Sequence, residues 1–586
     1  MSFFEGNIKH LSTNDSHHIG ELDIDIHEGN VNNYNAVHKM DSMFKGTKQK
    51  RELIFIFGVL SIEEVKELIE SSNPNSIFII LETNQEMFYH ALHNKDLSIL
   101  ENRNIALFVD KTDYVAKYIE ELLMTKAVFL IKNVRFYLTY YYRELQLVHT
   151  KELLKIVSST IKYTLFSLGN SIEDSLEGLE NNMLNLKYLR KSRDFSKLKN
   201  VFKGYPCIVV SAGPSLDKNI GYLKQAQGKA VILAVDTIID KLLNHGIVPD
   251  FCFSIERIKL VYEYFYQDKI IPDSVTLIAP PVIRPEIFEE FKGNISIPMR
   301  DNVIEYSWLN DILELDEEAF VSMGASVAHL TFGFATHIGS SPIILVGQDL
   351  AYNQETGSTH STGTIYKNDE SKIAEDYVET EGYYGKSVKT QRLWIDFKQW
   401  FELEIMSKGL EVINATEGGV KIEFTKQMRL KDVIDKYCTL ELNVQKIINN
   451  INNYQLDEAR VLNNFYNKLE ELKELQAVVR EVENQLNHIK IDNHMSKKEL
   501  LKVLEKMGVV NQLIDKVYNK KILLHNLQSF IINIFQRFYS IPEKLSFDTV
   551  HTNLEIQREF VLTLNVVIKR IIKIMEEKYS LMREIR

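Results

Sequence analysis

The stretch CIVVSAGPSLDKNI, residues 207–220, decides the fold of this chain. It opens as a short apolar run, breaks at Ala212-Gly213-Pro214-Ser215, and continues as a helical pattern. A buried strand that passes through a small-residue turn into a helix is typical of a doubly wound parallel sheet, whose ligands bind at the carboxyl ends of the strands. Backbone N–H groups at such a turn favour an anion. The stretch therefore predicts either a nucleotide site or a tight turn without a ligand.

Apolar runs alternate with helical patterns on both sides of this stretch. In residues 205–427 they include AVILAVD, FCFSIE, VTLIAPP, an edge run VSMGAS (residues 321–326) and PIILVGQDL, and we expect a central Rossmann-like, doubly wound domain. In residues 46–150 the runs LIFIFGVL, SIFIILE, IALFVD and AVFLIKN (residues 127–133) predict an N-terminal α/β domain with a parallel sheet. The predicted fold class is therefore α/β.

The other regions of the chain do not show this alternation of apolar runs and helical patterns. Residues 1–45 are polar and predict a loosely ordered arm or a small cap, and residues 151–204 predict a helical connector. Residues 428–586 predict a helical C-terminal domain, because they contain long helical patterns and a long stretch without proline. Apolar residues recur there at helical spacing, with charged residues between them: Leu462, Phe465, Leu469, Leu472, Val479, Val482 and Leu486.

Composition excludes several classes of protein. A chain of 586 residues is too long for one hydrophobic core, which predicts several domains. The formal net charge of −11 gives no electrostatic footprint for nucleic acid. The three cysteines form no CxxC pair, which argues against a disulfide framework or a cysteine zinc site. No signal peptide is recognisable, and no run reaches the ~18 apolar residues of a membrane span. We expect a cytoplasmic protein.

Polar side chains follow two strands of the predicted central sheet. Asp236 and Thr237 come directly after AVILAV, and Glu256 ends FCFSIE. Because the carboxyl ends of parallel strands meet at one edge of a sheet, these groups are predicted to share a crevice with Ser215, where they would serve ribose, a cation or proton transfer. Two alternatives stay open: Asp236 only caps the next helix, and Glu256 forms a surface salt bridge.

Small and polar residues mark a second part of the same predicted crevice. Ser322 and Gly324 stand before a helix, where an anion would be favoured. The strand PIILV then ends in Gly347-Gln348-Asp349, and His360 lies in the loop beyond it. Loops past strand ends commonly line the sites of such sheets, so these residues are site candidates.

Residues 414–419, Asn-Ala-Thr-Glu-Gly-Gly, form a further strand end and glycine turn. Asn414 and Thr416 offer amide and hydroxyl groups to a base or a ribose, unless the segment is an ordinary turn. The chain has no HExxH, no GxSxG, no Walker A and no GxGxxG motif, which argues against metalloprotease, serine-hydrolase and classical dinucleotide sites.

Together, the ordered segments GNSIEDSLEGLENN, VVSAGPSLDKNI, AVDT, GIVPDFCFSIE, MGASVAHLTFGFA, PIILVGQDLAY and NATEGG resemble the motility accessory factor (Maf) glycosyltransferases. The resemblance covers about residues 165–425, and the flanking α/β and helical regions are arranged similarly. It implies transfer of a nonulosonic acid, such as pseudaminic or legionaminic acid, from a CMP-activated donor to Ser or Thr of flagellin before export. The implied partners are thus flagellin and the CMP-activated sugar.

The central region is also similar to bacterial sialyltransferases that use CMP-sialic acid. By that similarity the site residues would surround the donor, with Gly213, Pro214 and Ser215 at the CMP part, Asp236 and Thr237 beside it, and Ser322 and Gly324 approaching the donor. Ala212 stands where those enzymes have Asn, and Ser387-Val388-Lys389-Thr390 stands where they have the catalytic His. The general base is therefore unassigned by the similarity.

The chemistry limits the choice of base. An acceptor hydroxyl must lose a proton as it attacks the anomeric carbon, and His360, Asp349 and Glu256 are the candidates, in that order. The donor already carries its leaving group, so no cofactor is required and a divalent metal is optional.

Two other functions compete with sugar transfer. The AGPSLD pattern also resembles archaeal 6-hydroxymethylpterin diphosphokinases, which would imply ATP and Mg²⁺. A non-catalytic flagellin chaperone is the third hypothesis, in which the helical region grips a partner helix. The sequence leaves the oligomeric state open.

Overall fold

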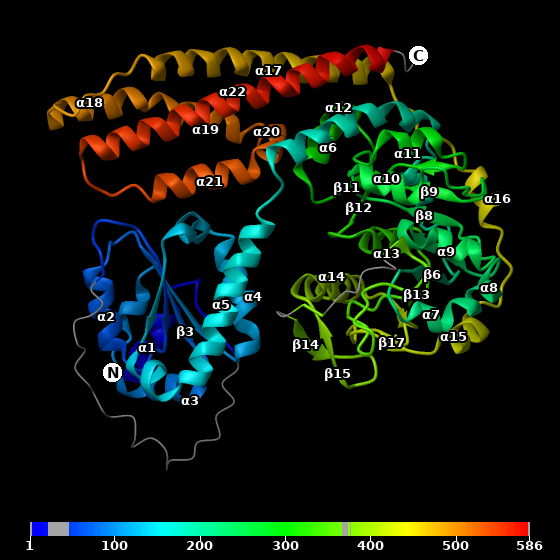
Figure 1. Ribbon diagram of the computed structural model, residues 1–586, viewed down its shortest axis with the longest axis horizontal. Coiled ribbons are helices and arrows are strands. Elements are labelled where there is room, and N and C mark those ends of the chain that lie inside the picture. The colour runs from blue at the N-terminus through cyan, green and yellow to red at the C-terminus, as the bar shows by residue number, and fades with distance from the viewer. Residues whose placement is uncertain (1–2, 21–45, 366–372, 375–376, 584–586) are drawn as a thin grey trace. The chain divides into compact units, whose positions relative to one another are not determined.

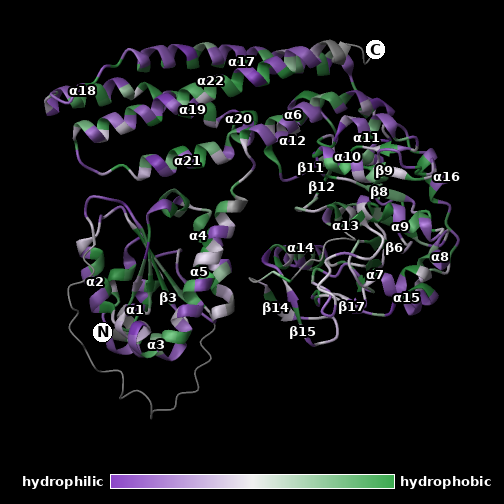
Figure 2. Cartoon of the chain, in the orientation of Figure 1, coloured by the Kyte–Doolittle hydropathy of each residue, from purple (hydrophilic) through white to green (hydrophobic). Residues whose placement is uncertain are grey.

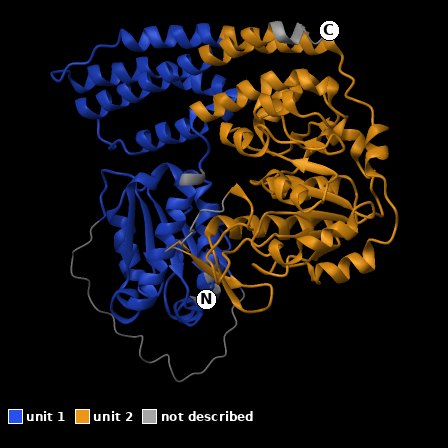
Figure 3. Ribbon diagram, turned by 45° about the vertical axis from the view of Figure 1, so that its right-hand side comes forward, with its two compact units in different colours: residues 1–172, 475–568 blue, residues 173–474, 569–586 orange. Residues whose placement is uncertain are grey.

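The computed structural model describes residues 3–20, 46–365, 373–374 and 377–583. The chain forms two compact units, residues 1–172 with 475–568 and residues 173–474 with 569–586 (Figure 3). Each unit is therefore built from segments that are far apart in the sequence. Both contain a parallel sheet, which confirms the predicted α/β class.

The first unit contains a five-stranded sheet of order β1-β4-β3-β2-β5, in which every pairing is parallel (Figure 1). Its strands are β1 (His18–Ile19), β2 (Leu53–Phe57), β3 (Ile77–Glu82), β4 (Ile105–Val109) and β5 (Val134–Leu138). The helices around it are α1 (Phe3–Leu11), α2 (Ile62–Ser71), α3 (Gln85–Asn94), α4 (Val115–Leu123) and α5 (Leu147–Ser167).

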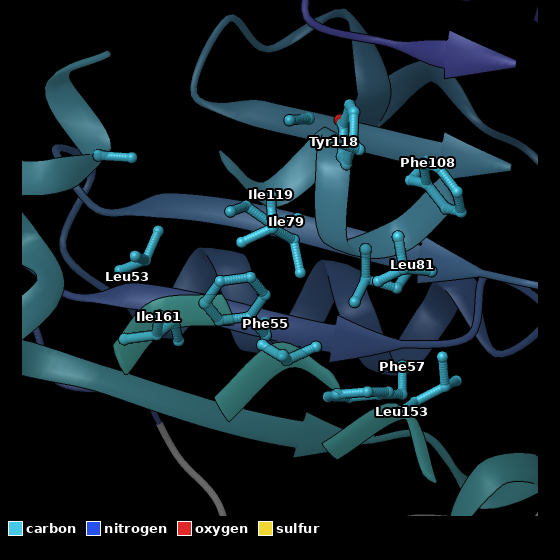
Figure 4. Close-up of a cluster of buried hydrophobic side chains, with 14 of the residues drawn as sticks. Leu53, Phe55, Phe57, Ile79, Leu81, Phe108, Tyr118, Ile119, Leu153 and Ile161 are labelled. Carbon is cyan, nitrogen blue, oxygen red and sulfur yellow. The ribbon is translucent and has the colours of Figure 1, made fainter. Parts of the chain in front are cut away.

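Apolar side chains cover both faces of this sheet. Leu53, Phe55 and Phe57 of β2 pack with residues of α4 and α5 (Figure 4), and Ile54 and Ile56 pack with residues of α1, α2 and α3. Alternate residues of a strand point to opposite faces, so a strand covered on both sides is apolar throughout. Figure 2 shows the difference, with hydrophobic strands and helices of mixed character.

The prediction of a strand over residues 127–133 is wrong. Residues Lys126–Asn133 form a 3₁₀ helix, η4, and the fifth strand is Val134–Leu138. A short apolar run has the length and character of either a buried strand or a buried helix, so periodicity alone could not separate them. The apolar side of η4 contacts α21: the Gln536 side-chain amide donates to the Val128 carbonyl over 3.2 Å, and the rings of Phe129 and Phe535 lie 5.3 Å apart.

The polar N-terminal arm contributes structure to the first unit. The Asn7 side-chain amide donates to the Leu92 carbonyl over 2.8 Å, and β1 extends the sheet beside β4. Residues 21–45 of the predicted arm lie outside the described residues.

The second unit contains an eight-stranded parallel sheet of order β10-β9-β8-β7-β6-β13-β16-β17. Its strands are β6 (Cys207–Val210), β7 (Val231–Val235), β8 (Phe251–Phe253), β9 (Thr276–Ile278), β10 (Ile295–Ser296), β13 (Ile343–Val346), β16 (Val412–Asn414) and β17 (Lys426–Gln427). The strands from β6 to β10 run outward in chain order, and β13 returns to the other side of β6. The topological switch point, where doubly wound sheets bind ligands, thus lies between β6 and β13.

Helices and two short sheets complete this unit. The helices are α6 (Ile172–Asn185), α7 (Leu216–Asn219), α8 (Leu223–Ala226), α9 (Ile239–Asn244), α10 (Lys259–Phe265), α11 (Pro285–Glu290), α12 (Ile304–Leu313), α13 (Val327–His337), α14 (Arg392–Lys408), α15 (Leu430–Tyr437) and α16 (Val444–Asn449). The predicted edge strand at residues 321–326 is instead β12 (Phe320–Val321), which pairs with β11 (Met299–Arg300) apart from the main sheet. The strands β14 (Val378–Glu381) and β15 (Ser387–Thr390) form an antiparallel hairpin.

The C-terminal region is helical, as predicted. It comprises α17 (Glu458–Asn487), α18 (Lys497–Met507), α19 (Val509–Tyr518), α20 (Lys521–Asn526), α21 (Gln528–Tyr539) and α22 (Phe547–Arg583). The division into compact units cuts through the long helices α17 and α22, so each helix contributes residues to both units. Within the described residues, none of the helices combines the length and apolar character that crossing a membrane requires.

Candidate functional site

The loop after β6 lies at the switch point and is fastened to the end of β13. The Ser211 N–H donates to the Val346 carbonyl over 2.9 Å, and the Gly213 N–H donates to the Gly347 carbonyl over 2.8 Å. A Cβ atom at residue 213 would overlap the Asp349 carboxylate and the Gly347 carbonyl oxygen. Position 213 therefore requires glycine because two strand ends approach each other there.

Asp349 anchors the rest of this loop. Its carboxylate accepts hydrogen bonds from the Ser215 N–H over 3.1 Å and from the Ser215 hydroxyl over 2.7 Å. Burial raises the pKa of Asp349 to about 6, because a charged carboxylate is disfavoured away from water and the two bonds from Ser215 offset this only in part. The N–H groups of Gly213 and Ser215 are thus bonded to the protein itself, although the loop sequence is also compatible with a nucleotide site.

A chain of hydrogen bonds joins the ends of three strands. The Ser211 hydroxyl, after β6, donates to the Gln348 side-chain carbonyl over 2.7 Å. The Gln348 N–H, after β13, donates to the Thr416 hydroxyl over 3.2 Å. The Thr416 N–H in turn donates to the side chain of Asn414, at the end of β16, over 3.1 Å. Thr416 and Asn414 do not line the cavity described below, and their hydrogen bonds position Gln348, which does.

A cavity of about 170 Å³ lies above these strand ends. Five of the residues predicted from the sequence line it: Gly213, Thr237, Gln348, Asp349 and His360. The remaining lining residues are Ser211, Ala212, Val235, Ser326, Val327, Ala328, Gly347, Leu350, Ala351, Thr359, Trp394 and Phe397. The cavity is thus polar on the side of the strand ends and apolar on the side of α14.

The N-terminus of α13 forms one wall of the cavity. The Ser326 side chain caps this helix by accepting a hydrogen bond from the His329 N–H over 3.3 Å. Val327 and Ala328 occupy the first turn, whose N–H groups have no partner within a helix and carry the positive end of its dipole. This wall is therefore the part of the cavity best suited to an anion.

Ser322 and Gly324, predicted to approach the donor, do not line the cavity. The Ser322 hydroxyl donates to the Glu404 carboxylate over 3.2 Å, and the Gly324 carbonyl accepts a hydrogen bond from Arg300. Gly324 has φ of 50°, and a Cβ atom there would overlap the ring of His329. These two residues shape the turn before α13, and Ser326 takes the place predicted for them.

The groups after β7 and β8 separate from one another. Asp236 is buried and accepts hydrogen bonds from the Thr237 N–H over 2.8 Å and from the Ser254 hydroxyl over 2.8 Å. Burial raises its pKa to about 6. Thr237 lines the cavity, whereas Glu256 is exposed and does not. Asp236 therefore orients Thr237 from behind the cavity wall.

The loop that carries His360 is tied to the rest of the site. The Ser361 N–H donates to the Ala212 carbonyl over 2.8 Å. Lys241 bridges Asp217 and the Thr362 carbonyl, donating to the latter over 2.7 Å. His360, between these anchors, lines the cavity, and its Nδ1 lies 2.8 Å from the Thr359 hydroxyl.

An aromatic wall on α14, which was not predicted from the sequence, lines another side of the cavity. Trp394 and Phe397 line the cavity, and the Trp394 ring lies 5.1 Å from that of Tyr352. Two aromatic residues three positions apart lie on one face of a helix, but this pattern is also typical of core packing. Only the fold brings residue 394 to the strand end at residue 213.

No group of three or more His, Cys, Asp or Glu side chains within the described ranges could hold a metal ion. Pro214 belongs to the loop after β6 but does not line the cavity.

The chain is similar to a solved structure of another protein. The Maf glycosyltransferase of Magnetospirillum magneticum AMB-1 matches with a TM-score of 0.55 and 16% sequence identity, over 91% of this chain and 80% of that one. The chain has the fold of this Maf glycosyltransferase. The resemblance predicted from the ordered segments is thus confirmed for the fold, and the Maf fold extends over nearly the whole chain.

Two sequence comparisons give shorter matches. Residues 180–355 match the family described as 6-hydroxymethylpterin diphosphokinase MptE-like. This match includes the loop after β6 and the start of α13, but ends before His360 and α14. A Treponema pallidum (strain Nichols) protein, described only as uncharacterized, is 32% identical over 88 residues, which are 15% of this chain and 41% of that protein.

Proposed function

We propose that this chain is a glycosyltransferase that moves a nonulosonic acid, such as pseudaminic or legionaminic acid, from a CMP-activated donor to Ser or Thr of flagellin. The proposed reaction takes place in the cytoplasm, before export of the acceptor. The observation that carries the proposal is the cavity at the β6–β13 switch point, in a chain with the fold of a Maf glycosyltransferase. The loop after β6, the start of α13 and the aromatic face of α14 meet around it.

The cavity walls suit the parts of a nucleotide-activated sugar. The N-terminus of α13, at Ser326 and Val327, would face the phosphate, since helix N–H groups and the helix dipole favour negative charge. Trp394 and Phe397 offer an apolar wall for the base. Thr237 and Gln348 offer a hydroxyl and an amide to ribose or sugar hydroxyls.

The proposed reaction needs a base and a stabilised leaving group. A bond forms between the acceptor oxygen and the anomeric carbon, while the bond from that carbon to the CMP phosphate oxygen breaks and its electron pair leaves with CMP. His360 is the preferred base, because it lines the cavity in a loop beyond β13. Asp349 is already bonded to Ser215, and Glu256 lies away from the lining, so both rank behind it.

A transfer assay tests the proposal. Purified chain, a CMP-activated nonulosonic acid and flagellin are incubated, and the intact mass of flagellin is followed. We expect one or more additions of the sugar mass with wild type. We expect His360→Ala to reduce the rate at least about 100-fold, as loss of a general base typically does. Absence of transfer from CMP-activated donors, together with transfer from another nucleotide sugar, would refute the donor class.

The MptE-like match favours a second candidate, a diphosphokinase that uses ATP and Mg²⁺. The match covers 180–355, so His360 and the aromatic wall of α14 lie outside it. A diphosphokinase would form AMP from ATP in the presence of a pterin and Mg²⁺, which chromatography of the nucleotides detects. We expect no AMP, since the first candidate accounts for more of the cavity.

A further inference from the structure

A second cavity lies within the first unit, at the carboxyl edge of its own sheet. It has a volume of about 440 Å³, within the roughly 300–1,000 Å³ typical of small-molecule sites. The strand order places β2 between β3 and β5, so the winding order of the sheet reverses between β2 and β5. Residues that follow β3, β4 and β5 line the cavity, which therefore lies at the carboxyl edge where doubly wound sheets bind ligands. Its lining residues are Thr83, Asn84, Gln85, Glu86, Lys111, Tyr141, Tyr142, Gln146 and His149.

A chain of polar groups runs from the interior to this cavity. The Tyr142 hydroxyl donates to the buried Glu82 carboxylate over 2.7 Å and accepts a hydrogen bond from the Thr83 N–H over 3.2 Å. The Thr83 hydroxyl lies 2.7 Å from Nε2 of His149. The Glu82 carboxylate also accepts bonds from the N–H groups of Val59 and Asn84, over 3.1 and 2.9 Å. The buried Glu82 and Tyr142 therefore hold Thr83 in place, and Thr83 contacts His149.

The backbone next to the cavity is tightly packed and partly irregular. Gly58 has φ of 99°, a left-handed conformation that favours glycine, and a Cβ atom there would overlap Thr139 and Tyr142. Tyr141–Leu145 form a single π-helical turn between β5 and α5, a feature that is frequent at functional sites. The central site proposed above uses none of these residues.

The lining indicates the class of ligand. Hydroxyl, carboxamide and imidazole groups, which together donate and accept hydrogen bonds, come from Thr83, Gln146 and His149. The one lysine, Lys111, is balanced by Glu86, so the lining does not provide the clustered positive charge that a nucleotide polyphosphate requires. A compact polyhydroxylated molecule with at most one charge matches this wall.

We propose that this cavity of the N-terminal α/β domain is a saccharide-binding site that takes a monosaccharide-sized ligand. It is separate from the donor cavity of the second unit and does not depend on the proposed transfer reaction. Thr83, backed by Tyr142 and Glu82, would fix the orientation of His149 through Nε2, and Nδ1 of His149, now 3.5 Å from the exposed Glu152 carboxylate, would turn to a sugar hydroxyl. The Gln146 amide donates to the Tyr141 hydroxyl over 2.9 Å, so Gln146 would bond a sugar hydroxyl through its side-chain oxygen.

Titration of the full-length chain tests this site. The probes are N-acetylneuraminic acid and N-acetylglucosamine, with CMP and ATP for comparison. Calorimetry and saturation-transfer NMR measure the binding of each probe. We expect a sugar probe to bind, and His149→Ala and Gln146→Ala each to weaken it about five- to tenfold, as loss of a hydrogen bond does. Lys151→Ala, an exposed change on α5 outside the lining, serves as the matched control and leaves affinity unchanged.

A variant of the other cavity separates the two sites. Trp394→Ala is expected to leave sugar binding unchanged. Sugar binding that is lost in Trp394→Ala but kept in His149→Ala would overturn the proposal, because the sugar would then occupy the central cavity. Binding of neither sugar, or His149-dependent binding of a nucleotide instead, would also overturn it. Heat-unfolding midpoints equal to wild type show that each variant is folded.

Discussion

Two buried carboxylates hold the residues around the central site in place, Asp349 in the cavity lining and Asp236 behind it. Asp349 fastens Ser215, and Asp236 fastens Thr237 and Ser254. Such groups are costly to bury, and their hydrogen bonds to neighbouring loop residues indicate that they hold the shape of the site. His360 also lines the cavity, in the loop beyond β13.

The roles of Asp349 and His360 can be separated by kinetics. Asn in place of Asp349 still accepts a bond from the Ser215 N–H, so Asp349→Asn should change kcat less than about tenfold. His360→Ala should lower kcat at least about 100-fold and leave CMP affinity within about twofold of wild type. The reverse order of the two kcat losses would make Asp349 the base.

Gly213 admits a direct steric test. Gly213→Val should abolish CMP binding, because its side chain would overlap the Asp349 carboxylate and displace the loop after β6. Calorimetry with CMP measures the loss, and circular dichroism checks that the fold persists. Unchanged affinity would remove this loop from the nucleotide site.

Asp236 predicts a pH dependence of stability. Its pKa is raised from 3.8 to about 6 in the folded chain, so the folded state binds this proton more tightly than the unfolded state. Its contribution to the free energy of unfolding is thus lost as pH rises from about 4 to about 6. The difference in free energy of unfolding between Asp236→Asn and wild type should therefore shift by about 1–3 kcal/mol in favour of the variant when pH is raised from about 4 to about 8. Denaturant unfolding at both pH values measures this, and a difference independent of pH would contradict it.

At the scale of elements, most of the central sheet could be predicted and the cavity wall only in part. The apolar runs before Gly213, Asp236 and Gln348 predict the strands correctly, since buried parallel strands are apolar on both faces. The strand predicted for residues 127–133 is wrong, because a buried 3₁₀ helix and a buried strand share that pattern. The α14 wall also escaped prediction, since helix periodicity shows an apolar face without showing what faces it.

The aromatic wall of α14 gives a prediction for nucleotide affinity. Trp394→Ala should weaken CMP binding by about 1–3 kcal/mol, the range found when an aromatic ring that stacks on a base is removed. Leu393→Ala, on the exposed side of the same helix, is the matched control and should bind CMP like wild type. Equal affinities for the two variants would show that the base does not lie against α14.

In the whole chain, the order of segments along the sequence does not show which segments form one compact unit. The five regions defined from the sequence stay predictions, and the compact units combine them differently: residues 475–568 join the N-terminal segment. Local sequence patterns show the periodicity within a segment, but they do not show that Val128 contacts Gln536, which is 408 residues away. The contacts between η4 and α21 show how this combination is made.

Because the chain forms two compact units, we expect them to unfold separately. Phe535→Ala removes the ring beside Phe129, and we expect the first unit to lose about 1–3 kcal/mol, less than a fully buried Phe because the ring is partly exposed. Leu501→Ala, an exposed change in the same unit, should have little effect. Hydrogen exchange resolved by peptide measures both units. Equal loss of protection in residues 205–427 would show that the units unfold together.

The proposed function requires that the β6–β13 cavity bind a cytidine nucleotide. The most direct test is a heat-unfolding titration of the full chain with CMP, CDP, ATP and GTP, with and without Mg²⁺. We predict selective stabilisation by CMP and CDP, reaching about 2.7 kcal/mol at a ligand concentration 100 times Kd. A Mg²⁺-dependent preference for ATP would contradict the claim and favour the diphosphokinase, and no shift with any nucleotide would favour the flagellin chaperone.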